Sequence, residues 1–193
     1  KRPLVLVGQG VELGNAGEEL RAFIEKAGLP AGCTLLGLSA LPTNHPLNVG
    51  MLGMHGSLGA NKKTQECDLL IAVGMRFDDR ITGKLDTYAK QARKIHFDID
   101  PSEINKNVTV DVAVLGDCKE TLPAVTALLE QKTHTEWRES FRQWDSKERE
   151  VVIEPQIHPA DGPLRMGEVV RRVTELSHDK AVLVTDVGQN QMM

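Results

Sequence analysis

The sequence predicts an α/β fold with a doubly wound, mostly parallel sheet of about six strands flanked by helices. Short apolar runs that end in glycine or a carboxylate alternate with longer stretches of helical periodicity. The most apolar run, Asp68–Val73, lacks the polar alternation of a half-buried strand and is therefore expected to be buried on both faces. These observations together indicate a Rossmann-like sheet rather than a mainly antiparallel one.

The first expected strand is Pro3–Val7, which is closed by Gly8-Gln9-Gly10. Apolar residues recur at helical spacing over Ala16–Ala27, so a helix is expected there. A second strand is predicted over Cys33–Leu36, ahead of a stretch rich in glycine, proline and histidine at 37–61.

Strands are also predicted at Lys94–Ile99 and Asp111–Leu115, followed by a helix over Cys118–Gln131. Together with the first two strands and Asp68–Val73, they bring the number of predicted strands in this sheet to five. Periodicity leaves the sixth open between Leu47–Leu52 and Ile81–Tyr88.

The pattern changes after Lys132. Thr133 and Glu136 have the spacing of a capping box, and the aromatic residues Trp137, Phe141 and Trp144 recur at helical spacing. An appended helix is therefore expected, with the aromatic stripe more suited to packing than to stacking on a ligand.

Three prolines within Glu154–Pro163 indicate a linker, after which Met166–Leu176 reads as a helix and Ala181–Thr185 as an apolar strand. The chain is thus expected to divide into a Rossmann-like domain, an appended helix with linker, and the start of a further domain, at residues 1–132, 133–163 and 164–193.

Composition excludes several classes of function. The formal net charge of −4 leaves no basic field for nucleic acid, and no apolar run approaches the length of a membrane span, so neither is an expected partner. The three cysteines are far apart, which argues against a disulfide framework or a zinc site and favours a reducing cytoplasm. The chain begins with Lys1 and ends just after a strand, and we expect it to be a fragment.

Ligands of open parallel sheets bind beyond the carboxyl ends of the strands. Gly8 and Gly10 could let backbone N–H groups approach a phosphate, but Leu13 stands where a dinucleotide fingerprint has its third glycine. A plain tight turn is the alternative. Arg76 and Arg80 follow another strand and suit phosphate oxygens, although a loop held by Arg–Asp pairs explains them equally well.

Two more strand ends carry carboxylates. Asp98 and Asp100 stand where nucleotide-binding sheets present an acceptor to a ribose hydroxyl, and Asp117 repeats the pattern. The glycine-rich loop Gly50–Ser57 could lie flat against an extended ligand, with Met54 and His55 lining it, although a lone histidine is more often structural. The sequence holds no recognisable nucleophilic triad or P-loop.

Four ordered motifs closely resemble the catalytic subunit of the acetohydroxyacid synthase family, also called acetolactate synthase. The similarity extends over almost the whole chain and lies in Gly50–Asn61, Ile71–Gly83, Ile95–Lys106 and Thr185–Gln189. It implies the central, FAD-binding domain of a three-domain thiamin-diphosphate enzyme, followed by the linker and the start of the diphosphate-binding domain.

The full enzyme of this family decarboxylates pyruvate and joins the two-carbon unit to pyruvate or 2-ketobutyrate, with loss of CO₂, in branched-chain amino-acid biosynthesis. Thiamin diphosphate and Mg²⁺ serve that reaction, while the flavin is usually regarded as structural. A homodimer or homotetramer with a regulatory subunit is expected. The family's catalytic glutamate and its Gly-Asp-Gly metal motif are absent from these 193 residues, so the fragment itself is expected to be inactive.

The resemblance implies a set of flavin contacts at the strand ends and in the glycine-rich loop. They are Gly8, Gly10, Thr34, Leu35, Met54, His55, Gly74, Arg76, Asp78, Arg80, Ile81, Asp98, Ile99, Asp117 and Cys118. The chain departs from the family at Gln9 and Met75, where small residues are common, and at Asn190 and Met193, where the family has histidine and tryptophan.

Two other readings stay open. The domain could be a scaffold without flavin, as in other thiamin-diphosphate decarboxylase-type enzymes. An NAD-dependent dehydrogenase is weakened by the broken glycine fingerprint and the lack of a catalytic histidine or lysine.

Overall fold

The computed structural model describes residues 1–178, 180–186 and 188. They belong to two compact units, Lys1–Gln143 and Trp144–Met193.

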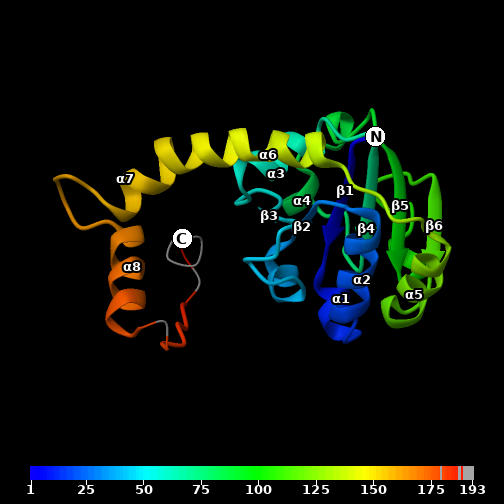
Figure 1. Ribbon diagram of the computed structural model, residues 1–193, viewed down its shortest axis with the longest axis horizontal. Coiled ribbons are helices and arrows are strands. Elements are labelled where there is room, and N and C mark those ends of the chain that lie inside the picture. The colour runs from blue at the N-terminus through cyan, green and yellow to red at the C-terminus, as the bar shows by residue number, and fades with distance from the viewer. Residues whose placement is uncertain (179, 187, 189–193) are drawn as a thin grey trace. The chain divides into compact units, whose positions relative to one another are not determined.

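The first unit is built on a six-stranded sheet with the order β3-β2-β1-β4-β5-β6 (Figure 1). Every neighbouring pair is parallel, which confirms the predicted sheet. The order reverses between β1 and β4, as it does in dinucleotide-binding folds. The strands are β1 (Pro3–Val7), β2 (Ala31–Cys33), β3 (Asn48–Met51), β4 (Leu69–Val73), β5 (Arg93–Asp98) and β6 (Val112–Leu115).

The first unit has helices at the three predicted places, residues 17–27, 118–128 and 135–148, and three short helices that the sequence analysis did not predict. They are α1 (Gln9–Leu13), α2 (Gly17–Ala27), α3 (Leu58–Thr64), α4 (Asp79–Thr82), α5 (Cys118–Leu128) and the first part of α6 (Thr135–Glu148). Short 3₁₀ turns lie at Leu35–Ala40, Leu85–Thr87 and Pro101–Glu103. No helix in the described part of the chain has the length and apolar character needed to span a lipid bilayer.

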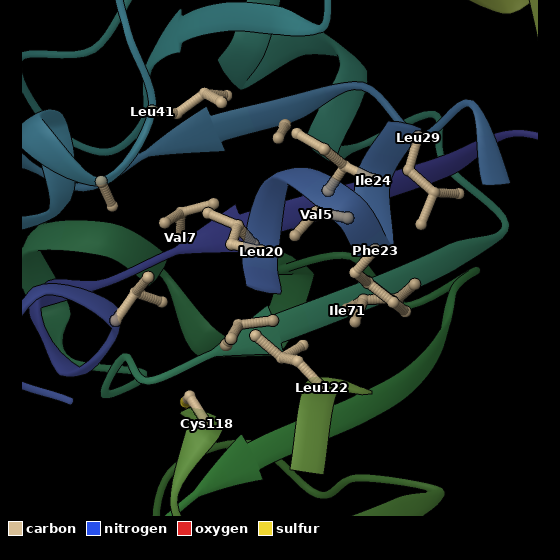
Figure 2. Close-up of a cluster of buried hydrophobic side chains, with 14 of the residues drawn as sticks. Val5, Val7, Leu20, Phe23, Ile24, Leu29, Leu41, Ile71, Cys118 and Leu122 are labelled. Atoms are coloured by element: carbon tan, nitrogen blue, oxygen red, sulfur yellow. The ribbon is translucent and has the colours of Figure 1, made fainter. Parts of the chain in front are cut away.

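The two faces of the sheet bury separate hydrophobic clusters because successive strand residues point to opposite sides. Val5 and Val7 of β1 pack with α2 and α5 on one face, as Figure 2 shows. Leu4 and Leu6 pack on the other face with residues of α3 and α6. This double burial explains why the central strands are almost continuously apolar.

The expected sixth strand is β3, at the first of the two predicted positions. The alternative, Ile81–Tyr88, contains the end of α4 and a 3₁₀ turn instead. The second strand was predicted too far along the chain, because β2 ends at Cys33. Cys33 pairs with Val7, the last residue of β1, so the ladder has no partner beyond it.

Helix α6 contributes Trp137 and Phe141 to the second cluster. Their ring centroids are 5.2 Å apart, and Trp137 Nε1 donates a hydrogen bond of 2.7 Å to the Pro3 carbonyl. The predicted packing role of these two residues is confirmed. The predicted capping box is wrong, since α6 begins at Thr135, two residues after Thr133.

The second unit continues with a π-helical stretch at Arg149–Ile153, then α7 (Glu154–Ile157) and α8 (Met166–Leu176). Helix α8 agrees with the prediction, but α7 occupies the first part of the expected linker.

The strand predicted at Ala181–Thr185 is wrong, because these residues have no regular structure and no described strand pairs with them. A strand needs a neighbour for its backbone hydrogen bonds. The motif residues Val187 and 189–193, with the departures at Asn190 and Met193, lie outside the described residues.

Candidate cofactor-binding cleft

A cleft of about 700 Å³ lies at the carboxyl ends of the strands of the first unit. Its lining residues follow β1, β2, β4, β5 and β6, and the cleft is centred where the strand order reverses. At such a point the crossovers on either side lead to opposite faces of the sheet and leave a crevice. The volume is in the usual range for cofactor sites, roughly 300 to 1,000 Å³.

Most of the residues predicted from the sequence come together in this cleft. Twelve of them line it, namely Gly10, Thr34, Leu35, Gly74, Arg76, Asp78, Arg80, Ile81, Asp98, Ile99, Asp117 and Cys118. Gly8, Met54 and His55 are not among its lining residues. Met54 instead lines a smaller neighbouring cavity of about 290 Å³, which shares Arg80 and Ile81 with the cleft.

Gly8 and Gly10 pack against the loop after β4. The Gly8 N–H donates to the Val73 carbonyl at 2.9 Å, and the Gly10 N–H donates to the Gly74 carbonyl at 2.8 Å. A Cβ on Gly8 would lie 2.3 Å from the Gly74 oxygen, closer than atoms can approach. Close backbone packing therefore accounts for both glycines, and their predicted contact with a flavin stays a prediction.

The loop after β4 presents two arginines. Arg76 has its guanidinium 3.5 Å from Asp78 and its side chain 67% exposed, while Arg80 is 3.4 Å from Asp79 and 70% exposed. Such long, solvated ion pairs contribute little to stability. The guanidinium groups are thus largely free to bind an anion.

Asp78 has a structural task as well. Its carboxylate caps α4 by accepting hydrogen bonds from the N–H groups of Arg80 (3.1 Å) and Ile81 (3.3 Å). The cap fixes the turn that carries Arg80. The sequence left open that Arg–Asp ion pairs alone hold this loop together. The cap shows that Asp78 also fixes the start of α4.

Asp98 is the most buried carboxylate of the cleft. One oxygen accepts a 2.9 Å hydrogen bond from the Asp100 N–H, which orients the group at the end of β5. Asp100 is exposed, and its hydrogen bonds with Ser102 lower the pKa of its carboxyl group. Both side chains therefore present oxygens that can accept hydrogen bonds.

Asp117 and Cys118 begin α5. The Asp117 carboxylate caps the helix by accepting a 2.8 Å hydrogen bond from the Lys119 N–H. Burial, with a smaller effect of the neighbouring carboxylates, raises the pKa of the Cys118 thiol to about 11. The Cys118 thiol therefore lines the cleft as an uncharged group at physiological pH and is not a nucleophile.

Sequence reasoning did not assign several residues that line the cleft. Leu13, Leu36 and Met75 add apolar surface, and Glu103 adds a carboxylate. Leu36 lies in a 3₁₀ turn where a strand was expected, and Leu13 was noted only as a break in a glycine pattern. Proximity to a strand end was the signal that could have indicated both.

The chemistry of the cleft is that of binding. Cationic groups stand at the β4 loop, a carboxylate acceptor stands at β5, and apolar side chains lie around them. Within the described residues, no group of three or more histidine, cysteine or acidic side chains could hold a metal ion. Such a lining suits an extended ligand with phosphates, hydroxyls and flat apolar surface.

The fold is that of the Rossmann-like class, an open and all-parallel α/β sheet, and the cleft lies at the carboxyl ends of its strands. A family model described as the central domain of thiamine pyrophosphate enzymes matches residues 1–125, and the chain belongs to this family.

Individual relatives narrow the comparison. The chain is 47% identical to the acetolactate synthase large subunit of Parasynechococcus marenigrum, 43% to the isozyme 2 large subunit of Escherichia coli and 39% to chloroplastic acetolactate synthase 1 of Oryza sativa. Each alignment covers 100% of this chain but only 31%, 34% and 30% of the respective relative. The chain therefore spans about a third of the length of these relatives.

Proposed function

We propose that the chain is the FAD-binding central domain of an acetolactate synthase catalytic subunit. The observation that carries the proposal is identity of 39 to 47% over the whole chain to proteins of that name in bacteria and plants. The activity proposed for the parent protein is condensation of pyruvate with pyruvate or 2-ketobutyrate, with loss of CO₂, in branched-chain amino-acid biosynthesis.

The cleft has the properties that FAD requires. FAD carries a diphosphate, ribose hydroxyls and two flat ring systems, and the lining supplies a group for each. Arg76 and Arg80 would contact the diphosphate, because a guanidinium matches phosphate oxygens in charge and geometry. Asp98, held by the Asp100 N–H, would accept a hydrogen bond from a ribose hydroxyl.

Apolar residues would cover the flat rings. Leu35 and Ile99 are exposed at the cleft, and Ile81 lines both the cleft and the smaller cavity. The other flavin contacts that the family resemblance implies, including Gly8, Gly10 and Cys118, are proposed to lie near the same ligand. FAD would act here as a structural group, as the family resemblance implies.

Thiamin diphosphate supplies the electron sink for decarboxylation in this enzyme family. Its site and that of Mg²⁺ are proposed to lie in other parts of the parent protein. Residues 1–132 would be the central domain, 133–163 its helical connection, and 164–193 the start of the diphosphate-binding domain. A cytoplasmic homodimer or homotetramer with a regulatory subunit is the proposed assembly.

A scaffold without flavin is the second candidate, and one observation favours it. The N–H groups of Gly8 and Gly10 bond to carbonyls of the neighbouring loop, so this glycine turn need not contact a ligand. In that case the domain would only join two catalytic domains.

Titration with FAD separates the two candidates. The purified chain is dialysed against FAD, and bound flavin is measured by its visible absorbance and by quenching of its fluorescence. We expect saturable binding of about one FAD per chain, with NAD as the control that does not compete. Absence of saturable binding in the folded chain would favour the scaffold.

A further inference from the structure

Asn61 of α3 holds the loop that carries Met54 and His55. Its side-chain oxygen accepts a 3.0 Å hydrogen bond from the Gly53 N–H, and its side-chain nitrogen donates a 2.8 Å hydrogen bond to the Gly53 carbonyl. Both backbone groups of one residue are thus paired with a single amide. Only asparagine and glutamine offer a neutral donor and acceptor side by side in this way.

Gly53 can form this pair because of its unusual backbone. Its φ is +97°, which side-chain-bearing residues rarely adopt. A Cβ at this position would lie 2.6 Å from the Arg80 carbonyl oxygen and 3.0 Å from the Ile81 side chain. The loop therefore lies directly on α4.

The next residue joins the loop to α4. The Met54 N–H donates a 2.8 Å hydrogen bond to the Arg80 carbonyl. Arg80 and Ile81 line both the cleft and the smaller cavity, and Gly53, Met54 and Asn61 line that cavity. A chain of contacts thus leads from Asn61 through the loop to a cationic residue of the cleft.

We infer that Asn61 is a positioning residue for the cleft. By pairing with both backbone groups of Gly53 it keeps the loop 53–56 seated on α4, which sets where Met54, His55 and Arg80 stand. Asn61 does not line the cleft itself, so it would act through these residues. The consequence for FAD rests on the proposed function, whereas the consequence for the loop does not.

The decisive variant is Asn61→Asp, which keeps size and shape. One carboxylate oxygen can still accept from Gly53, but the other faces the Gly53 carbonyl and can no longer donate. Asn44→Asp is the matched control, because it makes the same charge change at an exposed turn before β3.

Amide hydrogen exchange of the whole chain reads out the loop directly. We expect exchange across residues 51–57 to become about tenfold faster in Asn61→Asp, with β1 and α2 unchanged and with Asn44→Asp like the wild type in this segment. Exchange across 51–57 equal to wild type would overturn the inference. Should Asn61→Asp fail to fold, the Gly53 amide of the wild type decides, because an unprotected amide there contradicts the bond to Asn61.

FAD affinity of the same three proteins tests the effect on the cleft. We expect the dissociation constant to rise about tenfold in Asn61→Asp and to stay constant in Asn44→Asp. A faster loop with unchanged affinity would contradict the positioning role. If the wild type binds no FAD, the proposed function fails. The exchange result still tests whether Asn61 holds the loop 53–56 in place.

Discussion

The imidazole of His96 lies with its Nε2 atom 3.4 Å from a carboxylate oxygen of Asp98, two residues further along β5. Residues two apart on a strand share one face, so the contact follows from the strand itself. The same Nε2 is 2.9 Å from the Met75 carbonyl, which can only accept. Nε2 therefore carries a hydrogen, and the ring links the end of β5 to the loop that bears Arg76.

Replacing His96 is expected to destabilise the chain. His96 is fully buried, so His96→Leu would leave the Met75 carbonyl without its donor at a cost of about 1–3 kcal/mol. His96→Gln keeps an N–H donor at a similar reach and should recover part of this loss. Urea unfolding of the wild type and both variants is the measurement. Equal losses in the two variants would show that packing of the ring against Phe77, with the ring centroids 5.0 Å apart, dominates.

Removing the Arg76 guanidinium is expected to weaken FAD binding about ten- to a hundredfold, the value of a charge-assisted contact to phosphate. Its ion pair with Asp78 is long and solvated, so the fold should be little affected. Calorimetric titration of Arg76→Ala with FAD tests this. Arg142→Ala, which removes an exposed arginine of α6, is the control. Unchanged affinity would mark Arg76 as a loop residue only.

Gly8→Ala is expected to destabilise the fold by roughly 1–3 kcal/mol or more, as overpacking does. The new Cβ would lie 2.3 Å from both the Gly74 oxygen and the Met75 Cβ, so the two loops must separate. Gly17→Ala is the matched control, because its Cβ would lie 3.6 Å from the Ala40 carbonyl, an ordinary contact. Thermal unfolding should lower the midpoint of Gly8→Ala only. Two equal midpoints would refute close packing as the reason for this glycine.

The strands could be predicted because burial on both faces leaves long apolar runs in the sequence, as in β4. Ends and connections were harder. Leu35 looks like a continuation of β2, yet β2 stops where its partner β1 stops. The apolar residues Val182 and Val184 predict a strand. A strand also needs a partner strand for its hydrogen bonds, and an apolar run does not indicate whether one is present.

The cleft could be predicted in outline because parallel strands bring their carboxyl ends to one edge. The roles within it could not. Asn61 bonds to the backbone of Gly53, eight residues away, and His96 bonds to the carbonyl of Met75, 21 residues away. Nothing in the residue pattern indicates such partners, and only the packed structure brings them together.

Stability should fall as the pH rises from about 9 to 11. Burial raises the pKa of the Cys33 thiol from its ordinary value of 9.0 to about 11. Below pH 9 the thiol is protonated in both states and has no effect. Between these values the unfolded chain loses the proton and the folded chain keeps it, which favours unfolding by about 1.4 kcal/mol per pH unit.

Cys33→Ala should make this decline less steep, since it removes one of the buried thiols. Chemical unfolding at pH 8, 9 and 10 under reducing conditions measures the slope for both proteins. Identical slopes would mean that Cys33 ionises equally easily in the folded and unfolded chain.

The chain by itself is expected to form no acetolactate, although we propose that its parent protein does. Thiamin-dependent condensation needs a metal to hold the diphosphate and a carboxylic acid to activate the cofactor, and positioning these groups accounts for most of the rate. In the described residues no acidic or histidine cluster could hold a metal ion. His55 is exposed and does not line the cleft. Asp98 lies at the end of β5, where we propose a ribose contact and no thiamin site.

The assay is acetolactate formation from pyruvate by the purified chain with thiamin diphosphate, Mg²⁺ and FAD, beside an acetolactate synthase of full length. We expect turnover no higher than that of a boiled-protein blank. We expect the chain to lack the catalytic acid and the metal-binding residues altogether. Adding more cofactor should therefore not restore activity. Measurable turnover would require a thiamin site within these 193 residues and would overturn their assignment to a central domain.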